Sequence, residues 1–134
     1  MTMDIKPWIG ALLLVLLAAC VPQAGPQPSE VGRFLVYFDE FSANLTPEAR
    51  QVVADAVARA RQTNAHSIRI EGRASATGSP TANQYLAATR SQVVADELAK
   101  DGLNPATFRQ VRIGQTGSGD PSVAERRVDI VLEP

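Results

Sequence analysis

The hydrophobic pattern after residue 32 contains four segments typical of β-strands, either as apolar runs or as alternating apolar and polar residues. Residues 33–38 (RFLVYF) are rich in β-branched and aromatic side chains and end at an acidic pair, which predicts a first strand. Residues 67–72 alternate strictly and place Ile68 and Ile70 on one face, which predicts a second strand. Residues 108–113 and 127–132 predict the third and fourth strands in the same way.

Two further segments have the period of an amphipathic helix. Thr46 followed by Pro47 supplies an N-cap and a first helical residue, and the apolar positions 52, 53, 56, 57 and 60 then form one stripe. Ser79 and Pro80 can open a second helix that runs to about residue 100 and stops at Asp101 and Gly102. We expect its inward face to carry Leu86, Val93, Val94 and Leu98.

The elements follow one another in the order β-α-β-α-β-β. This order predicts an α+β sandwich in which two helices pack on one face of a four-stranded mixed sheet. The other face of the sheet is then left to solvent or to a partner. The three glycines and the proline within residues 114–121 predict a loop between the last two strands.

The N-terminus has the pattern of an export signal. Residues 8–19 form an apolar run after Lys6 that covers about 18 Å as a helix, which is short of the ~30 Å hydrocarbon core. The sequence LAAC at 17–20 resembles the lipobox of bacterial lipoprotein signals, which implies cleavage after residue 19 and three acyl chains on Cys20. Val21 after the cysteine is compatible with export to the outer membrane. An uncleaved anchor or a plain secretory signal are the alternatives.

A short polar segment joins the predicted lipid anchor to the predicted domain. Residues 21–30 contain three prolines and no aromatic side chain, so they lack apolar surface to bury. Ten residues span at most about 35 Å. We therefore divide the chain into a signal peptide (1–19), a lipidated cysteine with its tether (20–32) and one domain (33–134) that stays close to the membrane.

Composition and charge exclude several kinds of function. The 13 Lys and Arg against 14 Asp and Glu give a formal charge of −1, which is atypical of a nucleic-acid-binding protein. A single cysteine permits no internal disulfide and no multi-cysteine metal site. His66 is the only imidazole, and no Gly-x-Ser-x-Gly motif is present, so the sequence indicates neither a hydrolase nor any cofactor.

Taken together, four segments resemble the OmpA-like peptidoglycan-binding domain of outer-membrane proteins and peptidoglycan-associated lipoproteins. The resemblance implies the predicted sandwich fold, a binding rather than an enzymatic role, and an outer-membrane lipoprotein whose domain faces the periplasm and binds the cell wall non-covalently. The matching segments are 36–39 with 42–49, 70–78, 83–90 and 126–130.

The third segment carries the residue that the resemblance makes most important. The family has Asn-x-x-Leu-Ser-x-x-Arg at this place; Asn83, Leu86 and Arg90 match it, and Ala87 replaces the serine. The resemblance implies that Arg90 holds a carboxylate of the diaminopimelate-containing stem peptide. Independently of the family, Arg90 falls inside the apolar stripe of its helix. Such a guanidinium reaches solvent, pairs with a protein acid such as Glu97 or Asp39, or receives an anionic ligand.

The same family has Gly-His-Thr-Asp after the second strand, whereas this chain has Gly-Arg-Ala-Ser at 72–75. The family's aspartate is expected to pair with the ammonium group of the ligand, and Ser75 carries no charge. Arg73 either adds a cation there or points to solvent, and we expect solvent. Asp39 matches the family and could approach the same pocket from the neighbouring loop, but it is followed by Glu40-Phe41 instead of the family's Phe-Asp.

Asn83 precedes Arg90 by seven residues, about 10.5 Å along the helix axis. Its side chain either contacts the same extended ligand, faces solvent or bonds to the neighbouring loop. Two functions follow from the resemblance. The first is a lipoprotein that ties the outer membrane to peptidoglycan. The second is an OmpA-like lipoprotein that lost this affinity with the acid at position 75 and serves as a protein-interaction component of an envelope complex.

Overall fold

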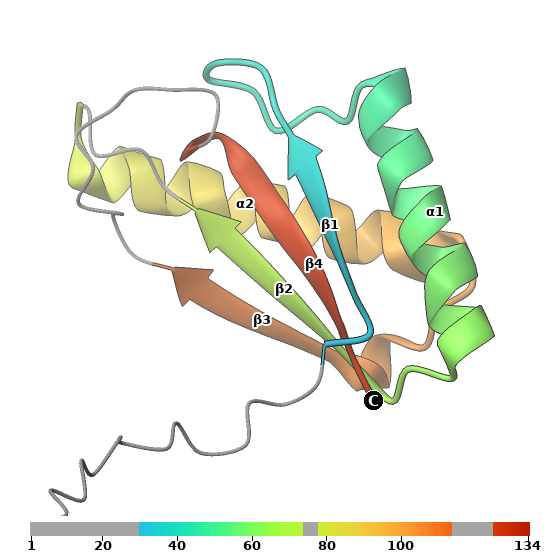
Figure 1. The fold of residues 1–134 in the computed structure, drawn as a ribbon. Coiled ribbons are helices and arrows are strands. Elements are labelled where there is room, and N and C mark those ends of the chain that lie inside the picture. Colours follow the sequence, from blue (N-terminus) through green and yellow to red (C-terminus); the bar gives the residue numbers. More distant parts are fainter. Residues whose placement is uncertain (1–29, 74–77, 114–124) are drawn as a thin grey trace, which may run out of the picture.

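The structure is a computed structural model that describes residues 30–73, 78–113 and 125–134. These residues form a four-stranded sheet and two long helices (Figure 1). The predicted signal peptide, Cys20, Ser75 and the loop at 114–121 lie outside the described residues.

The order and type of the predicted elements are confirmed. A short 3₁₀ helix, η1, precedes the third strand and was not predicted from the pattern. The elements are β1 (Gly32–Tyr37), α1 (Pro47–Thr63), β2 (Ser67–Arg73), α2 (Pro80–Lys100), η1 (Pro105–Thr107), β3 (Phe108–Ile113) and β4 (Arg127–Glu133).

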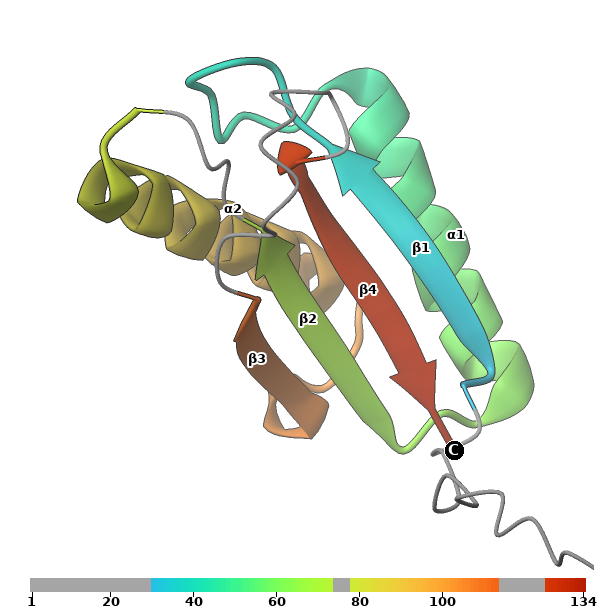
Figure 2. The same ribbon diagram turned by 60° about the vertical axis from the view of Figure 1, so that its left-hand side comes forward.

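The strands lie in the order β1-β4-β2-β3, so the last strand of the chain occupies a central place. β4 runs antiparallel to both β1 and β2, whereas β2 and β3 are parallel, which makes the sheet mixed. Both helices cover the same face, with α1 behind β1 and α2 behind β2 (Figure 2). The predicted sandwich is therefore confirmed.

The helix ends follow from their capping residues. The Thr46 side chain accepts a hydrogen bond from the Ala49 amide at 3.1 Å, and the Ser79 side chain accepts one from the Ala82 amide at 3.4 Å. Gly102 follows α2 with φ +101°, a backbone conformation that glycine adopts without strain. The termini predicted from these residues agree with the observed bounds.

The face of α2 that meets the sheet differs from the predicted one. Val94 and Leu98 are buried as expected, but Leu86 and Val93 are only half-buried. Small side chains at four-residue spacing occupy the contact instead, namely Ala87, Ser91 and Ala95.

Gly72 of β2 explains this close packing. A Cβ atom at Gly72 would lie 2.2 Å from Ser91 Oγ and 2.9 Å from the main-chain oxygen of Ala87. The backbones of α2 and β2 thus approach more closely than side chains on both elements would allow.

The uncovered face of the sheet carries two buried carboxylates directly opposite each other. Glu71 of β2 pairs in register with Asp129 of β4, and the two residues are 3% and 1% exposed. Like charges at opposed cross-strand positions are destabilising unless cations compensate them.

Arginines provide that compensation. Arg33 Nη1 donates to Glu71 Oε2 at 3.2 Å and to Asp129 Oδ2 at 2.9 Å. Arg69 Nη1 lies 2.6 Å from Glu71 Oε1, and Arg127 Nε donates to Asp129 Oδ1 at 2.8 Å. The expectation that Arg73 points to solvent is wrong, because its Nη2 lies 3.3 Å from Asp129 Oδ2.

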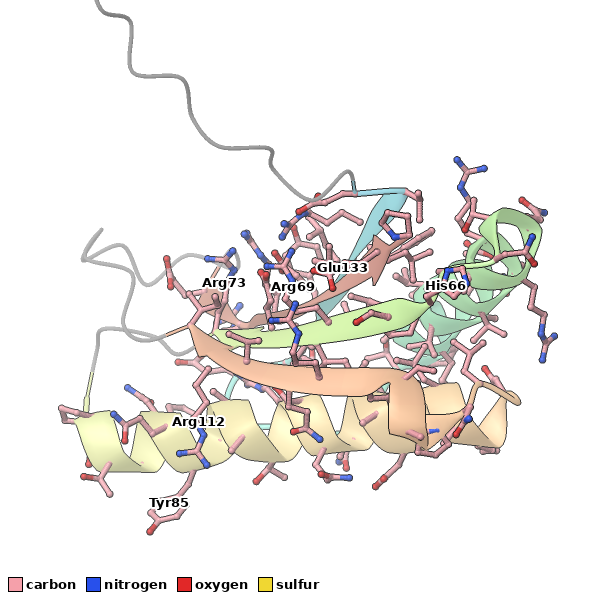
Figure 3. The ribbon with its side chains drawn as sticks, turned by 90° about the horizontal axis from the view of Figure 1, so that it is seen from below. His66, Arg69, Arg73, Tyr85, Arg112 and Glu133 are labelled. Atoms are coloured by element: carbon pink, nitrogen blue, oxygen red, sulfur yellow. The ribbon has the colours of Figure 1, made fainter. Side chains whose placement is uncertain are left out.

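Figure 3 shows Arg69, Arg73 and Glu133 together on the side of the sheet away from α2. The sheet therefore has an apolar face under the helices and an ion-pair network on the other face. The apolar core is formed by 16 buried residues of both helices, three strands and the loop between β1 and α1: Val36, Phe38, Leu45, Ala49, Val53, Ala56, Val57, Ala60, Ile68, Ile70, Val94, Ala95, Leu98, Val128, Ile130 and Leu132.

The network predicts that Arg33→Gln lowers the free energy of unfolding by about 2 kcal/mol, because the two facing carboxylates lose the nearer of the two arginines, Arg33 and Arg73, that pair with both of them. Arg109→Gln is the matched control on the same face: Arg109 bonds Glu133 at 3.1 Å, but its side chain is 58% exposed. We expect that control to cost less than about 1 kcal/mol. Urea unfolding measures both, and equal losses would contradict a bridging role for Arg33.

The pKa shifts of Glu133 and Glu30 on this face predict that the free energy of unfolding falls at acid pH. Burial acts to raise the pKa of Glu133, but hydrogen bonds from Arg109 and Ser67 and the charges of Arg109 and Arg69 outweigh it and hold this pKa below 4.5. The hydrogen bond from Arg33 lowers the pKa of Glu30 in the same direction. Between the folded-state and unfolded-state pKa values of these acids, the unfolded chain binds more protons than the folded one. The ion pairs therefore stabilise the fold fully above about pH 4.5, and this stabilisation is lost as the pH falls through the folded-state pKa values.

Chemical unfolding at a series of pH values between 6 and 3 tests this expectation. The unfolding free energy should fall below about pH 4.5, and Glu133→Gln should reduce the dependence. A free energy that stays constant between pH 5 and pH 3 would show that these pairs contribute nothing.

Candidate functional site

The candidate site lies where the loop between β1 and α1, residues 38–46, meets the middle of α2. Arg90 points from α2 into this loop and is 3% exposed. Its Nε donates to the main-chain oxygen of Ser42 at 2.7 Å, and its Nη2 donates to that of Asp39 at 2.9 Å. Its Cζ lies 5.2 Å from the centroid of the Phe38 ring, within cation–π range. Arg90 is buried, as its place in the apolar stripe predicted, but its contacts are with this loop and not with the sheet.

No carboxylate in residues 30–73, 78–113 and 125–134 forms an ion pair with Arg90. The carboxylate of Glu97 binds Arg50 at 3.0 Å and Lys100 at 3.4 Å instead. Asp39 reaches Arg90 through its main-chain oxygen and not through its side chain. Neither of the two internal ion pairs considered from the sequence is therefore formed, and the charge of Arg90 is met by carbonyl dipoles and an aromatic face.

A second cation lies close to this group. Burial and then the charge of Arg126 lower the pKa of Arg90 below its ordinary value. The main-chain oxygen of Arg126 accepts a hydrogen bond from the Phe38 amide at 2.9 Å, which fixes Arg126 beside the start of the loop. Its Nη1 is 3.9 Å from Glu40 Oε2, and its buried Nε has no hydrogen-bond partner among the described residues. The site thus holds two neighbouring cations, of which Arg126 is within ion-pair distance of Glu40.

The sequence interpretation gave Arg126 no role, although it quoted the segment 126–130. The missing signal was the sheet order: Arg126 meets Phe38 only because β4 inserts beside β1, and strand order is not readable from hydrophobic periodicity.

The loop that receives Arg90 has a defined geometry. The Ser42 amide donates to the main-chain oxygen of Asp39 at 3.2 Å, and the Asn44 amide donates to Ser42 Oγ at 3.0 Å. Between the two oxygens that Arg90 binds, Phe41 adopts φ +56° and is 86% exposed. Arg90 therefore holds both sides of a tight turn whose tip is an exposed aromatic ring.

The remaining predicted site residues are distributed differently. Asn83 is half-buried in the first turns of α2, where its main-chain N–H donates to the main-chain oxygen of Ser79 at 3.0 Å. Ser75 and Cys20 lie outside the described residues. The structure therefore brings Arg90 and the Asp39 backbone together.

A hollow of about 330 Å³ opens beside the same loop, but it is a poor place for an anion. It lies between residues 43–45, α1 and α2, and it is lined by the acids Asp96 and Glu97 and by Arg50, which is already paired with Glu97. Arg90 does not line it. Within the described ranges, no cluster of three His, Cys, Asp or Glu residues has the arrangement of a metal site.

Comparison with known families decides the classification. The sequence model of the OmpA family matches residues 37–128, which include the loop, Arg90 and Arg126. The chain belongs to the OmpA family.

Solved structures agree with this assignment at the level of the fold. The OmpA-like domain of FopA1 from Francisella tularensis subsp. tularensis SCHU S4 is 24% identical with a TM-score of 0.65, over 76% of this chain and 75% of that one. The peptidoglycan-associated lipoprotein from Burkholderia pseudomallei is 24% identical with a TM-score of 0.64, over 75% and 90%. A putative MotB-like protein from Desulfovibrio vulgaris is 25% identical with a TM-score of 0.61, over 75% and 72%.

The described part of this OmpA-family chain contains no helix that combines the length and the apolar character needed to cross a membrane.

Proposed function

We propose that this OmpA-family domain binds peptidoglycan non-covalently in the periplasm, and that a lipid on Cys20 ties it to the outer membrane. Arg90 is the residue that takes the wall's anionic group, a carboxylate of the diaminopimelate-containing stem peptide. The observation that carries the proposal is a buried guanidinium that no described carboxylate neutralises and that lies beside a second cation, Arg126.

The electrostatics favour an incoming anion. A buried cation is costly to maintain when only dipoles and an aromatic ring solvate it. Arg90 uses two of its five N–H donors for the carbonyls of Asp39 and Ser42. A carboxylate that bonds the remaining donors in the fork geometry of guanidinium gains charge-assisted hydrogen bonds and relieves the repulsion between Arg90 and Arg126.

The ammonium end of the ligand needs an acid, and the loop offers candidates. Ser75 supplies a hydroxyl where the family has an aspartate. Asp39 and Glu40 are exposed carboxylates on the loop that Arg90 holds. We propose that Asp39 meets the ammonium group, and that Asn83 and Ser75 bond the peptide next to it.

The proposed anchor matches the short tether. Lipidation of Cys20 and a tether of ten residues hold the domain within about 35 Å of the leaflet that carries the lipid. A domain held at that distance ties the wall to the outer membrane without reaching far across the periplasm.

Cosedimentation with purified peptidoglycan sacculi tests the proposal, using the mature lipoprotein in detergent. The proposal predicts that the protein pellets with sacculi and is displaced by soluble diaminopimelate-containing stem peptide. Protein that stays in the supernatant at every sacculus concentration would contradict it.

Two observations support a second function, that of a protein-interaction component of an envelope complex. The family's acid is replaced by Ser75, and Arg90 is enclosed by the chain's own loop. On this proposal, crosslinking in cells captures one protein partner, and Ser75→Asp creates wall binding that the parent protein lacks.

A further inference from the structure

Phe41 combines two features that its own packing does not explain. Its side chain is 86% exposed, the highest value among the large apolar residues described, ahead of Tyr85 at 72% and Tyr37 at 41%. Its φ of +56° lies in the left-handed region, which is unfavourable for a bulky side chain and favours glycine or asparagine. A ring in solvent gains little contact energy to offset this backbone strain.

The conformation of Phe41 is imposed by its neighbours. Arg90 binds the main-chain oxygens of Asp39 and Ser42, one on each side of Phe41, and the Ser42 amide closes the turn on Asp39. The turn thus presents the ring to solvent next to the group that we propose as the anion site. Strained residues of this kind persist where the surrounding structure fixes them, and they concentrate at ligand contacts.

We propose that Phe41 is a ligand-contact residue whose ring stacks on a sugar ring of the peptidoglycan glycan strand. This inference rests on the proposed wall binding and extends it from the stem peptide to the glycan. The stem peptide is attached to the glycan, so a domain that holds the peptide carboxylate at Arg90 has sugar rings within reach of the same loop. The electron-rich face of an aromatic ring attracts the polarised C–H bonds of a pyranose.

The surroundings of Phe41 favour a sugar over a protein partner. Glu40, Ser42 and Asn44 supply a carboxylate, a hydroxyl and an amide within three residues of Phe41 on the same loop, and these groups can bond sugar hydroxyl and acetamido groups. Phe41 is the one large apolar side chain exposed on residues 38–46. A protein hot spot, by contrast, is surrounded by further contacts that exclude water.

Phe41→Asn separates a binding role from a structural one because stability and ligand affinity should change in opposite directions. Asparagine tolerates a positive φ, so the thermal unfolding midpoint should rise by a few degrees. Affinity for a purified disaccharide-peptide fragment of the wall should fall about tenfold, whereas affinity for the free stem peptide should stay unchanged. Phe41→Trp is the control that keeps an aromatic face and should keep the disaccharide-peptide affinity.

The outcomes distinguish this inference from the proposed function. If the wild type binds both fragments but Phe41→Asn binds the disaccharide-peptide equally well, the glycan contact is overturned and wall binding stands. If the wild type binds neither fragment nor sacculi, the proposed function fails and this inference fails with it. If Phe41→Asn instead loses a crosslinked protein partner in cells, Phe41 is a protein contact and the glycan proposal is wrong.

Discussion

Arg90→Ala is expected to reduce affinity for peptidoglycan by a factor of thirty to several thousand, enough to leave the protein in the supernatant of a sacculus pull-down. Removing one partner of a buried, hydrogen-bonded charge pair costs about 2 to 5 kcal/mol, which corresponds to that range. Arg90→Lys should be nearly as weak, because an ammonium group cannot bond the carbonyls of Asp39 and Ser42 and also present a fork to a carboxylate.

The structural role of Arg90 must be measured alongside binding. Loss of its hydrogen bonds to the loop should lower the unfolding free energy by about 2 kcal/mol, so circular dichroism and urea unfolding have to show that the variant is folded under the binding conditions. Arg112→Ala is the matched control: Arg112 is an exposed arginine of β3 that extends toward α2 and Tyr85 (Figure 3). A folded Arg90→Ala protein that binds sacculi like the Arg112→Ala control would remove Arg90 from the site.

Gly72→Ala is expected to have the largest effect on stability, a loss of about 3 kcal/mol. The added methyl group would meet Ser91 Oγ at 2.2 Å and the Ala87 main-chain oxygen at 2.9 Å. The Ser91 side chain can rotate, but the Ala87 oxygen belongs to the backbone of α2 and moves only with the helix. Because α2 also carries Arg90, a shifted helix should weaken wall binding as well.

A double-mutant cycle with Ser91→Ala tests this contact. The second substitution removes the hydroxyl oxygen but leaves the Ala87 oxygen, so it should restore part of the stability that Gly72→Ala loses. Additive effects of the two substitutions, or a loss below about 0.5 kcal/mol for Gly72→Ala alone, would show that α2 and β2 are less closely packed than the structure indicates.

Local sequence signals predicted the elements because their physical causes are local. Thr46 and Ser79 cap the helices that start after them, and the alternation around Ile68 and Ile70 gives a strand with one apolar face. These patterns depend on neighbours within a few residues, so they are visible without tertiary structure. The resemblance to the OmpA family rested on the same segments and is confirmed by the match over 37–128.

The features that sequence reasoning missed arise from contacts between distant segments. Leu86 and Val93 seemed the natural inward residues of α2, but the close approach at Gly72 admits only small side chains. Arg73 seemed free for solvent, yet β4 brings Asp129 opposite Glu71 and draws Arg73 into the network. Arg126 joins Arg90 through the same placement of β4. The first case depends on how closely α2 packs on β2, and the other two depend on the strand order; no local pattern encodes either.

The most direct test of the central claim observes the Arg90 guanidinium itself. In the ¹⁵N-labelled protein, the Nε–Hε resonance of Arg90, assigned by its loss in Arg90→Lys, can be followed while diaminopimelate-containing stem peptide is added. The account predicts a saturable shift of this resonance with the same Kd as sacculus displacement, and no comparable shift for Arg112. Saturable binding of the peptide that leaves the Arg90 resonance unmoved would contradict the account.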